Sequence, residues 1–369
     1  MPYSPEIGHH ISALDTPSMV VNLELMESNI QKLMAQLLPT GVSIRPHLKT
    51  TKSALLARRL NEAGAKGGCV AKLSEAEVMT AKGFTDLLIT CEIVGKAKVQ
   101  RLVELFKENK TLRIVVDSEE GARQINDALA EAALSQPIMT LIDLNVGLHR
   151  TGVQPGGPAL KLAQYVASLP HLEIIGIQGY EGHLQHIHSL AERKARCLES
   201  MHILTTTAHS LRTAGHRMDV VTTGGTGTAT FCASVPGITE VQPGSFLFMD
   251  TDYRAALGPH YANSLTILAT VISKQGPTRV TIDAGLKALT TDSGLAECKD
   301  AAYRYGVLGD EHGSLEWEEG QARALEIGDR VEMLPSHIDP TINLHDVYYA
   351  HRGGIVEEIW QVDARGKVQ

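Results

Sequence analysis

The chain has 369 residues, a formal net charge of −8 and 43% hydrophobic residues. This is an ordinary globular composition, and the length is sufficient for one large α/β domain and a smaller second one. The negative charge argues against general nucleic-acid binding, and aromatic residues, at 4%, are too few for base-stacking platforms. No run of about 18 apolar residues occurs, so we expect no membrane span.

Cysteine usage indicates a reducing compartment. The chain has five cysteines, an odd number, and none forms a CxxC pair. The segment Met1–Glu6 lacks the basic region and apolar core of a signal peptide. We therefore expect a cytoplasmic protein with free thiols.

A strand–helix recurrence occupies the first two thirds of the chain. It opens with a strand over 18–23 and a helix over 25–38. The strands expected after it span 42–45, 68–72, 86–90, 112–117, 137–146, 172–180, 219–223 and 239–248. The helices expected between them span 53–63, a segment started by Ser74, 96–108, 119–133, 158–168 and 190–214.

These strands are short and apolar throughout, as in Ile114-Val115-Val116, which is typical of strands buried on both faces. Eight of them within about 230 residues suit a (βα)8 TIM-type barrel, although a doubly wound open sheet also alternates in this way. Beyond residue 250, β-like runs at 264–274, 278–282, 329–334 and 355–362 predict an antiparallel β domain. We therefore predict a barrel over 16–250 and a β domain made of 1–15 and 251–369.

In such a barrel, reactive groups lie just after the strands. Lys49 stands between a strand and a helix, although a solvated loop lysine would also occupy this position. The other residues at such positions are Lys72, Glu92, Arg150, Tyr180 to His186, the glycine turn at 224–227 and Gln242.

The segment Thr222–Thr228 contains the glycine turn and follows the seventh strand of the series. Backbone amides of small residues can approach a phosphate closely, and this is the usual phosphate position in such barrels. After the preceding strand come Tyr180, His183, His186 and His188, a cluster capable of proton transfer, although each histidine alone more often serves a backbone group.

The β domain contributes His337 and Asp339. Pro340 favours an extended backbone at Asp339, and in an extended segment both side chains point to one side. An imidazole and a carboxylate on one side can begin a divalent metal site, or the carboxylate can merely orient the imidazole. A lysine, a phosphate turn and this pair together favour pyridoxal 5′-phosphate, whose aldehyde a lysine amine can bind.

The order of motifs along nearly the whole chain resembles the D-threonine aldolase and D-serine dehydratase-like family of alanine-racemase-fold, pyridoxal-phosphate enzymes. The motifs are Asp15-Thr16-Pro17, Arg45-Pro46-His47-Leu48-Lys49-Thr50, Ala71-Lys72 with Glu75-Ala76-Glu77, Gly147-Leu148-His149-Arg150-Thr151-Gly152, the glycine turn, Gln242-Pro243-Gly244-Ser245, Asp283-Ala284-Gly285 and Pro335-Ser336-His337. The fold implied is an alanine racemase-like barrel with a β domain.

The resemblance also implies roles for individual residues. Lys49 would carry the cofactor, and His186 would take part in proton transfer. His337 and Asp339 would bind a divalent metal near the cofactor. The remaining residues of the implied cofactor site are Arg150, Tyr180, Gly225, Thr226, Gly227 and Gln242.

Two departures from the family pattern refine this expectation. Where the family often reads Thr-His-Lys, this chain has Thr50-Thr51-Lys52, and we expect Lys52 to be a surface lysine at a helix start. Dehydratase members typically place a cysteine where this chain has Asp339. An oxygen ligand favours Mn²⁺, Mg²⁺ or Ca²⁺ over thiolate-bound Zn²⁺, with Mn²⁺ preferred here, and this favours the aldolase branch.

The expected activity is retro-aldol cleavage of D-β-hydroxy-α-amino acids, with D-threonine giving glycine and acetaldehyde, by a homodimer. A D-serine or D-threo-3-hydroxyaspartate dehydratase and a 3-hydroxy-D-aspartate aldolase could use the same site. A non-catalytic pyridoxal-phosphate carrier is disfavoured by the extra β domain. A racemase would need a second base, for which Tyr253, Tyr261 and Tyr348 are available.

Overall fold

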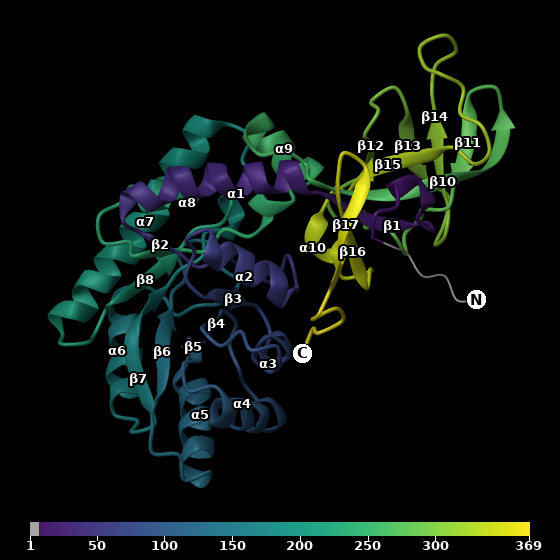
Figure 1. The fold of residues 1–369 in the computed structure, drawn as a ribbon. Helices are drawn as coiled ribbons and strands as arrows, with labels where there is room; N and C mark the ends of the chain where they lie inside the picture. Colours follow the sequence, from purple (N-terminus) through teal and green to yellow (C-terminus); the bar gives the residue numbers. More distant parts are fainter. Residues whose placement is uncertain (1–6) are drawn as a thin grey trace. The chain divides into compact units, whose positions relative to one another are not determined.

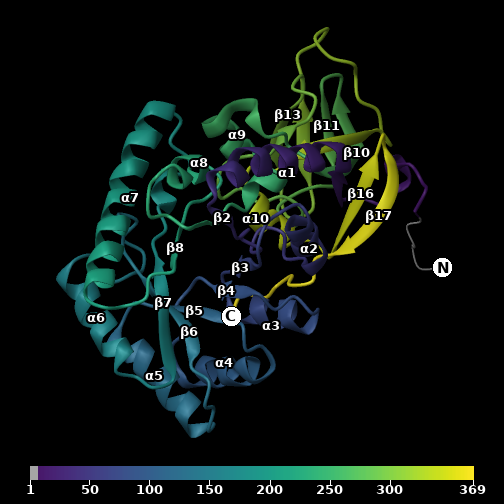
Figure 2. The same ribbon diagram turned by 60° about the vertical axis from the view of Figure 1, so that its left-hand side comes forward.

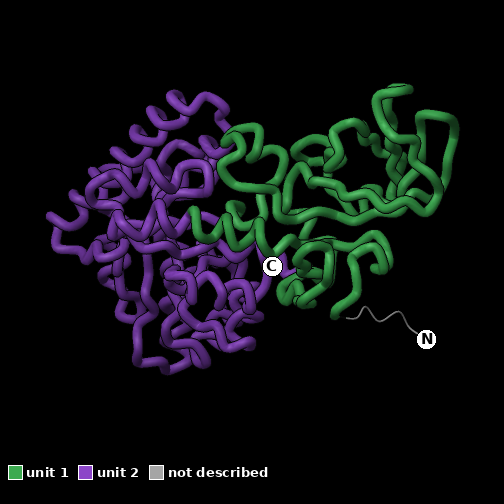
Figure 3. Tube along the Cα trace, turned by 45° about the horizontal axis from the view of Figure 1, so that its top comes forward, with its two compact units in different colours: residues 1–32, 245–366 green, residues 33–244, 367–369 purple. Residues whose placement is uncertain are grey.

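The computed structural model describes residues 7–369, which form two compact units (Figure 3). The barrel unit comprises residues 33–244 and 367–369, and the sheet unit comprises the residues up to 32 together with 245–366. None of the helices described in residues 7–369 is long and apolar enough to cross a membrane.

The barrel unit is built on eight parallel strands in the order β2-β9-β8-β7-β6-β5-β4-β3 (Figure 1). The two end strands meet through a parallel bridge between His47 and Cys69. Leu48 N donates to Cys69 O at 2.7 Å, and Cys69 N donates to Pro46 O at 2.8 Å. These contacts close the ring, which confirms the predicted barrel. The strands are β2 Ser43–Ile44, β3 Gly68–Val70, β4 Leu87–Ile89, β5 Arg113–Val116, β6 Ile138–Asp143, β7 Leu172–Gln178, β8 Val220–Thr223 and β9 Glu240–Val241.

Helices alternate with these strands and pack outside them (Figure 2). They are α2 Ala54–Glu62, α3 Leu73–Ala81, α4 Lys96–Glu108, α5 Glu119–Glu131, α6 Gly157–Ala167, α7 Leu190–Thr213 and the short α8 Ala229–Ala233. The bounds of all these helices except α8 were predicted to within a few residues. An apolar cluster within the barrel unit consists of Cys69, Leu88, Val115, Leu141 and Ile175. Strands that bury both faces in this way explain why their sequences do not alternate.

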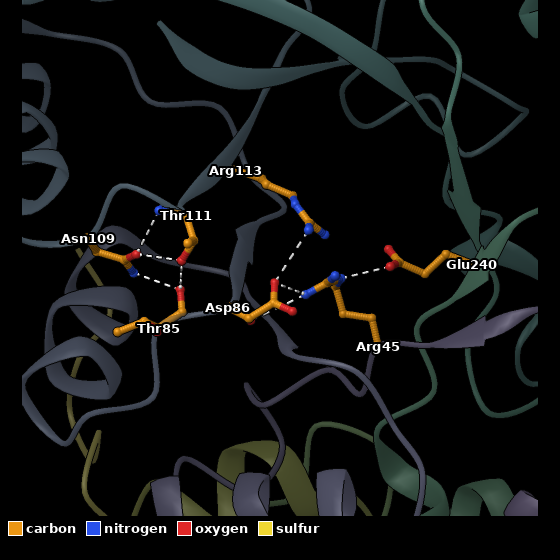
Figure 4. A network of polar contacts seen from close by, with 7 residues as sticks. All are labelled: Arg45, Thr85, Asp86, Asn109, Thr111, Arg113 and Glu240. Atoms are coloured by element: carbon orange, nitrogen blue, oxygen red, sulfur yellow. Dashed lines mark hydrogen bonds and ion pairs between the residues drawn. The ribbon is translucent and has the colours of Figure 1, made fainter. Parts of the chain in front are cut away.

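An ionic network with a buried Arg45–Glu240 pair and a partly exposed Asp86 lies at the amino-terminal end of the barrel strands (Figure 4). Arg45 Nε lies 2.8 Å from Glu240 Oε2, and Arg45 Nη1 lies 2.9 Å from Asp86 Oδ1. Arg113 Nη2 is 3.6 Å from the same oxygen of Asp86. Glu240 begins β9 and Asp86 precedes β4, so the network lies at the opposite end from Lys49. Arg45, although it opens the lysine motif, therefore stabilises the barrel base.

The sheet unit contains a nine-stranded, mostly antiparallel sheet, as predicted. Its main path runs β13-β14-β11-β10-β1-β16-β17, and β15 pairs with both β10 and β12. Among the strand pairs that the described residues form in this sheet, β1–β16 alone is parallel. The strands are β1 Ser18–Asn22, β10 Leu265–Gly276, β11 Arg279–Ile282, β12 Glu297–Cys298, β13 Arg304–Val307, β14 Gly313–Glu316, β15 Arg330–Leu334, β16 Val347–Arg352 and β17 Ile355–Gln361.

The placement of β1 differs from the predicted range. We placed Ser18–Asn22 at the start of the barrel range 16–250, but β1 pairs with β10 and β16 of the other sheet. The apolar strand followed by a helix, α1 Leu23–Leu37, has the same pattern as a barrel repeat. Because a strand buried on both faces fits either sheet, its sequence does not distinguish them.

Candidate active site

The predicted cofactor residues follow five neighbouring strands of the barrel. Lys49 follows β2, Gln242 follows β9 and the glycine turn 224–227 follows β8, while Tyr180 and Arg150 follow β7 and β6. In the sheet these strands are consecutive. Since carboxyl ends of parallel strands share one edge, the five segments form a continuous arc of the barrel rim.

Lys49 is exposed, while Leu48 and Thr50 beside it are buried. The loop is fixed at several points. Leu48 is hydrogen-bonded into the barrel closure, and Lys52 N donates to Leu48 O at 2.7 Å. His47 Nε2 lies 3.0 Å from Thr90 Oγ1, beyond β4. An exposed amine on a fixed backbone at the strand end meets the requirement for binding an aldehyde cofactor.

The prediction that Lys52 is a surface lysine was wrong. Lys52 is only 6% exposed, and its Nζ lies 2.6 Å from Glu75 Oε1. Glu75 Oε2 also accepts hydrogen bonds from Ala71 N and Lys72 N. Lys52 has a φ of 48°, a left-handed backbone conformation, and α2 begins only after it. Lys52 is therefore a loop residue whose side chain is buried in an ion pair.

Arg150 and Tyr180 lie together at the rim. The Arg150 guanidinium carbon is 5.6 Å from the centre of the Tyr180 ring, a cation–π distance. Both line a small pocket at the carboxyl ends of β4, β6 and β7. Its other lining residues are Thr90, Asp143, Leu144, Asn145, Val146, Leu148, Thr151 and Gln178.

The glycine turn rests on a fully buried carboxylate. Glu181 Oε2 accepts hydrogen bonds from Thr223 Oγ1 at 2.8 Å and from Gly224 N at 3.3 Å. The Thr228 hydroxyl donates to Glu181 Oε1. Glu181 and Thr228 have no exposed surface. This carboxylate fixes both ends of the turn, although it lies far from the turn in the sequence.

Gln185 fixes the middle of the turn. Its Oε1 accepts a hydrogen bond from Gly227 N at 2.9 Å. A Cβ at Gly225 would lie 2.5 Å from that oxygen, and one at Gly227 would lie 2.5 Å from the Gln185 carbonyl oxygen. Glycine is therefore required here by close packing. Gly225 N donates to Thr228 Oγ1 at 3.2 Å, so a phosphate at this turn would share these amides or contact Thr226 between them.

A buried chain of amides links Gln242 to an acidic side chain. Gln242 Nε2 donates to Thr222 Oγ1 at 2.8 Å and to Gln178 Oε1 at 3.3 Å. Gln178 Nε2 donates to Asp143 Oδ1 at 2.8 Å. Asp143 is the last residue of β6. The pKa of Glu92 is raised to about 8, mainly because its carboxyl group is buried and secondly because Asp143 is negatively charged.

The predicted histidine cluster divides into two environments. His183 is half-buried, and a Cβ at Gly147 would lie 3.1 Å from its Nε2. Burial lowers the pKa of His183, so the neutral imidazole is favoured. His186 and His188 are exposed, between η3 Gly182–Leu184 and α7. The role of His186 as a base stays a prediction.

The segment of the sheet unit that contains His337 and Asp339 is not extended, so that part of the prediction was wrong. His337 precedes the short helix α10 Ile338–Ile342, and Asp339 lies in its first turn. Pro340 is tolerated because first-turn amides have no acceptor within the helix.

Two further carboxylates hold this segment. Asp292 Oδ2 lies 2.5 Å from His337 Nδ1. Asp250 Oδ2 accepts a hydrogen bond from Ile338 N at 3.1 Å. Among the side chains described, no three His, Cys, Asp or Glu residues gather as a metal-binding group. A metal on His337 and Asp339 would therefore rely on two protein ligands, with the remaining positions left to water or substrate.

The comparison with known proteins covers both units. A family model described as "Alanine racemase, N-terminal domain" matches residues 21–252, and one described as "Putative serine dehydratase domain" matches residues 264–351. The chain belongs to the D-threonine aldolase and D-serine dehydratase-like family of alanine-racemase-fold enzymes.

Individual relatives of this family match nearly the full length. A D-threonine aldolase of an Arthrobacter species is 38% identical, over 99% of this chain and 97% of its own. A 3-hydroxy-D-aspartate aldolase of Paracoccus denitrificans is 34% identical, over 98% and 97%. The crystal structure of D-threonine aldolase from Filomicrobium marinum superposes with a TM-score of 0.94 at 35% identity, covering 99% of this chain and 100% of that one.

Membership of the alanine-racemase-fold family implies pyridoxal 5′-phosphate as the cofactor. The rim arc fits this molecule, because it offers an exposed lysine, a tyrosine ring with a guanidinium beside it, and a rigid glycine turn. The three tyrosines considered as racemase bases fit less well. Tyr253, Tyr261 and Tyr348 are buried, and burial raises the pKa of Tyr261 and of Tyr348, which does not suit a base.

The sequence analysis missed Asp143, Gln178 and Asp292 as supporting residues. It included Glu181 and Gln185 in the range Tyr180 to His186 but did not predict that they hold the glycine turn. Asp143 and Gln178 could have been found, since each ends an apolar strand. Asp292 lies in a turn between strands and has no such signal.

Proposed function

We propose that this chain is a lyase that uses pyridoxal 5′-phosphate and a divalent metal to cleave D-β-hydroxy-α-amino acids, with D-threonine giving glycine and acetaldehyde. The observation that supports this most is the full-length likeness to D-threonine aldolases of two organisms, in sequence and in fold. Both units are included in that likeness, so the proposal involves cofactor residues in the barrel unit and metal residues in the sheet unit.

Lys49 would bind the cofactor covalently, and Thr226 with Gly225 and Gly227 would hold its phosphate. Arg150, Tyr180 and Gln242 would orient its ring at the rim. When bound, pyridoxal 5′-phosphate supplies an electron sink for the electrons released as the Cα–Cβ bond breaks. His186 would take the proton of the substrate β-hydroxyl, directly or through water.

His337 and Asp339 would bind the metal, with Mn²⁺ as the first candidate. A divalent metal lowers the pKa of a hydroxyl that it binds, which assists removal of the hydroxyl proton. The hydrogen bond between Asp292 and His337 Nδ1 supports this assignment, because it fixes the ring and leaves Nε2 as the metal-binding nitrogen. Oxygen from Asp339 suits Mn²⁺, Mg²⁺ and Ca²⁺.

The second candidate is an enzyme acting on a 3-hydroxyaspartate. It is favoured by the 34% identity to the 3-hydroxy-D-aspartate aldolase of Paracoccus denitrificans and by the Delftia sp. HT23 D-threo-3-hydroxyaspartate dehydratase structure. That structure superposes with a TM-score of 0.86 at 26% identity, covering 95% of this chain. A D-serine dehydratase would use the same groups to release ammonia.

Product analysis separates these activities. The holoenzyme is incubated with D-threonine, D-serine or a D-3-hydroxyaspartate, with and without added Mn²⁺. We expect acetaldehyde and glycine from D-threonine, little reaction with L-threonine and none with the Lys49→Ala variant. Ammonia and a 2-keto acid as the main products would favour a dehydratase. The same preparation, passed through a sizing column with light-scattering detection, tests the proposed homodimer.

A further inference from the structure

His47 lies where the barrel closes, two residues before Lys49, and its backbone is fixed on both sides. Its N–H donates to Pro243 O, after β9, at 3.1 Å, and the residue forms a parallel bridge with Cys69 of β3. A Cβ at Gly244 would lie only 2.8 Å from His47 O, so the chain packs closely against this carbonyl. The imidazole ring is therefore attached to a backbone that has little room to move.

The two ring nitrogens of His47 contact two different groups. Lys49 N donates to Nδ1 at 3.4 Å, and Nε2 lies 3.0 Å from Thr90 Oγ1. Thr90 Oγ1 in turn donates to Val70 O at 3.2 Å. These contacts join the backbone of Lys49, after β2, to the residue that follows β4 and to the last residue of β3.

The same contacts determine which nitrogen of His47 carries the proton. A backbone N–H can only donate, so Nδ1 must offer its lone pair to Lys49 N and cannot carry a proton itself. The proton of the neutral ring is then on Nε2, which donates to Thr90 Oγ1, while the Thr90 hydroxyl donates to Val70 O. The neutral Nε2–H tautomer makes all three hydrogen bonds, whereas the other tautomer and the charged ring would place an N–H against Lys49 N–H.

Thr90 connects these hydrogen bonds to the rim pocket. It lines the pocket that also contains Arg150 and Tyr180. Its carbonyl oxygen accepts a hydrogen bond from Gln178 Nε2 at 3.2 Å. The contacts that hold Lys49 N therefore reach the wall of the pocket beside which the cofactor ring would lie.

We propose that His47, as the neutral Nε2–H tautomer, is a positioning residue for the cofactor lysine. The ring holds the amide of Lys49 and so fixes the direction in which the Lys49 side chain leaves the loop. The covalent bond forms between Lys49 Nζ and the aldehyde carbon, with loss of one water molecule. An amine that is already oriented loses less conformational freedom at this step, so the bond forms faster. The inference rests on the proposed function, because it assumes that Lys49 binds pyridoxal 5′-phosphate.

The test measures how fast the covalent bond forms. Apoenzyme is mixed rapidly with saturating pyridoxal 5′-phosphate, and the growth of the visible absorbance band gives the rate. His47→Gln places its amide nitrogen near the position of Nε2 and loses the acceptor for Lys49 N, whereas His47→Asn places an oxygen near the position of Nδ1 and keeps that acceptor. We expect His47→Gln to be slower by about fivefold to tenfold, as for the loss of one hydrogen bond, and His47→Asn to remain within about twofold of the parent.

Variants of Thr90 test the tautomer independently. Thr90→Val removes the acceptor of the Nε2 proton at nearly constant shape and should slow the reaction as His47→Gln does. Thr90→Ser keeps the hydroxyl and should react like the parent. His209→Gln, at an exposed position of α7, is the matched control and should leave the rate unchanged.

A second measurement separates positioning of the lysine from general support of the site. Equilibrium dialysis of pyridoxal 5′-phosphate in the Lys49→Ala background reports binding without the covalent bond, and adding His47→Gln should leave this affinity unchanged. An unchanged rate in both His47→Gln and Thr90→Val would overturn the inference, and so would a loss of affinity in the Lys49→Ala background as large as the loss of rate. If the parent forms no visible band, or forms it on another lysine, the proposed function fails and the role of His47 fails with it.

Discussion

Lys52 Nζ lies 2.6 Å from Glu75 Oε1, and both side chains are buried. The same carboxylate accepts hydrogen bonds from Ala71 N and Lys72 N. It therefore connects the Lys49 loop with the loop after β3. Removing one member of a buried ion pair weakens the compensation of the other charge, which can cost about 3–5 kcal/mol. We expect Glu75→Gln to lower the free energy of unfolding by about this amount in a denaturant titration.

Glu77→Gln provides the matched control. Its partner Arg101 Nη2 is also 2.6 Å away, but both side chains are more than a third exposed. Water screens such a pair, so its loss should lower stability by no more than about 1 kcal/mol. Equal effects of the two variants would show that the Lys52–Glu75 pair is not a special constraint on the lysine loop.

The identity of the cofactor lysine can be tested chemically. Borohydride reduction of the holoenzyme should attach the cofactor to the peptide that contains Lys49, and Lys49→Ala should lose activity by several orders of magnitude because a covalent step is removed. Lys72→Ala should still be labelled at Lys49. Label on the peptide of Lys52 or Lys72 would show that the site is assigned to the wrong lysine.

Thr226→Ala tests the phosphate turn. The variant removes at most one charge-assisted donor, worth roughly 1.5–3 kcal/mol. Cofactor affinity, measured by titration of the apoenzyme, should fall by about tenfold to a hundredfold. Thr230→Ala, on the exposed face of α8, should leave it unchanged. An unchanged affinity in Thr226→Ala would place the phosphate elsewhere.

Metal removal and substitutions test the proposed metal site at His337 and Asp339. A chelator should abolish activity, Mn²⁺ should restore it, and the visible spectrum of the bound cofactor should persist throughout. Asp339→Ala should behave like permanent chelation, whereas Asp339→Cys should shift metal preference toward Zn²⁺. Asp292→Asn should weaken metal affinity by about tenfold to a hundredfold, since the hydrogen bond that orients His337 is impaired. Full activity after exhaustive chelation, with no metal found by elemental analysis, would contradict the metal role.

Glu92 also predicts a pH dependence of stability. In the unfolded chain its carboxyl titrates near 4.5, but burial and Asp143 raise the pKa in the folded protein to about 8. Between these values the folded state binds more protons than the unfolded state, so stability falls as pH rises. Urea titrations at pH 5 and pH 8 should show a smaller decline in Glu92→Gln than in the parent. Parallel declines would mean that the carboxyl is ionised throughout this range.

Periodicity predicted the barrel well because each repeat is local, with an apolar strand followed by an amphipathic helix. The positions of Lys49, Tyr180 and Gln242 directly after strands were predicted for the same reason, whereas their roles stay predictions. The effect of Asp143 on the pKa of Glu92 could not be predicted, because no spacing shows which side chains lie near each other across β5. Lys52 was misassigned because neither its left-handed backbone conformation nor its ion pair with Glu75 can be read from its place before a helix. Likewise, β1 has the sequence of a barrel strand, and only its partners distinguish the two sheets.

The position of β1 between β10 and β16 determines the order in which the sheet unit can be assembled during synthesis. The ribosome releases β1 near the start of the chain, but both neighbouring strands are made only after the entire barrel. Three apolar residues of β1 are nearly or fully buried in the final sheet, namely Met19, Val20 and Val21. Their neighbouring strands have not been synthesised while the barrel folds. A nascent chain therefore exposes an unpaired apolar strand for most of its synthesis, which is a period of risk for aggregation and an opportunity for chaperone binding.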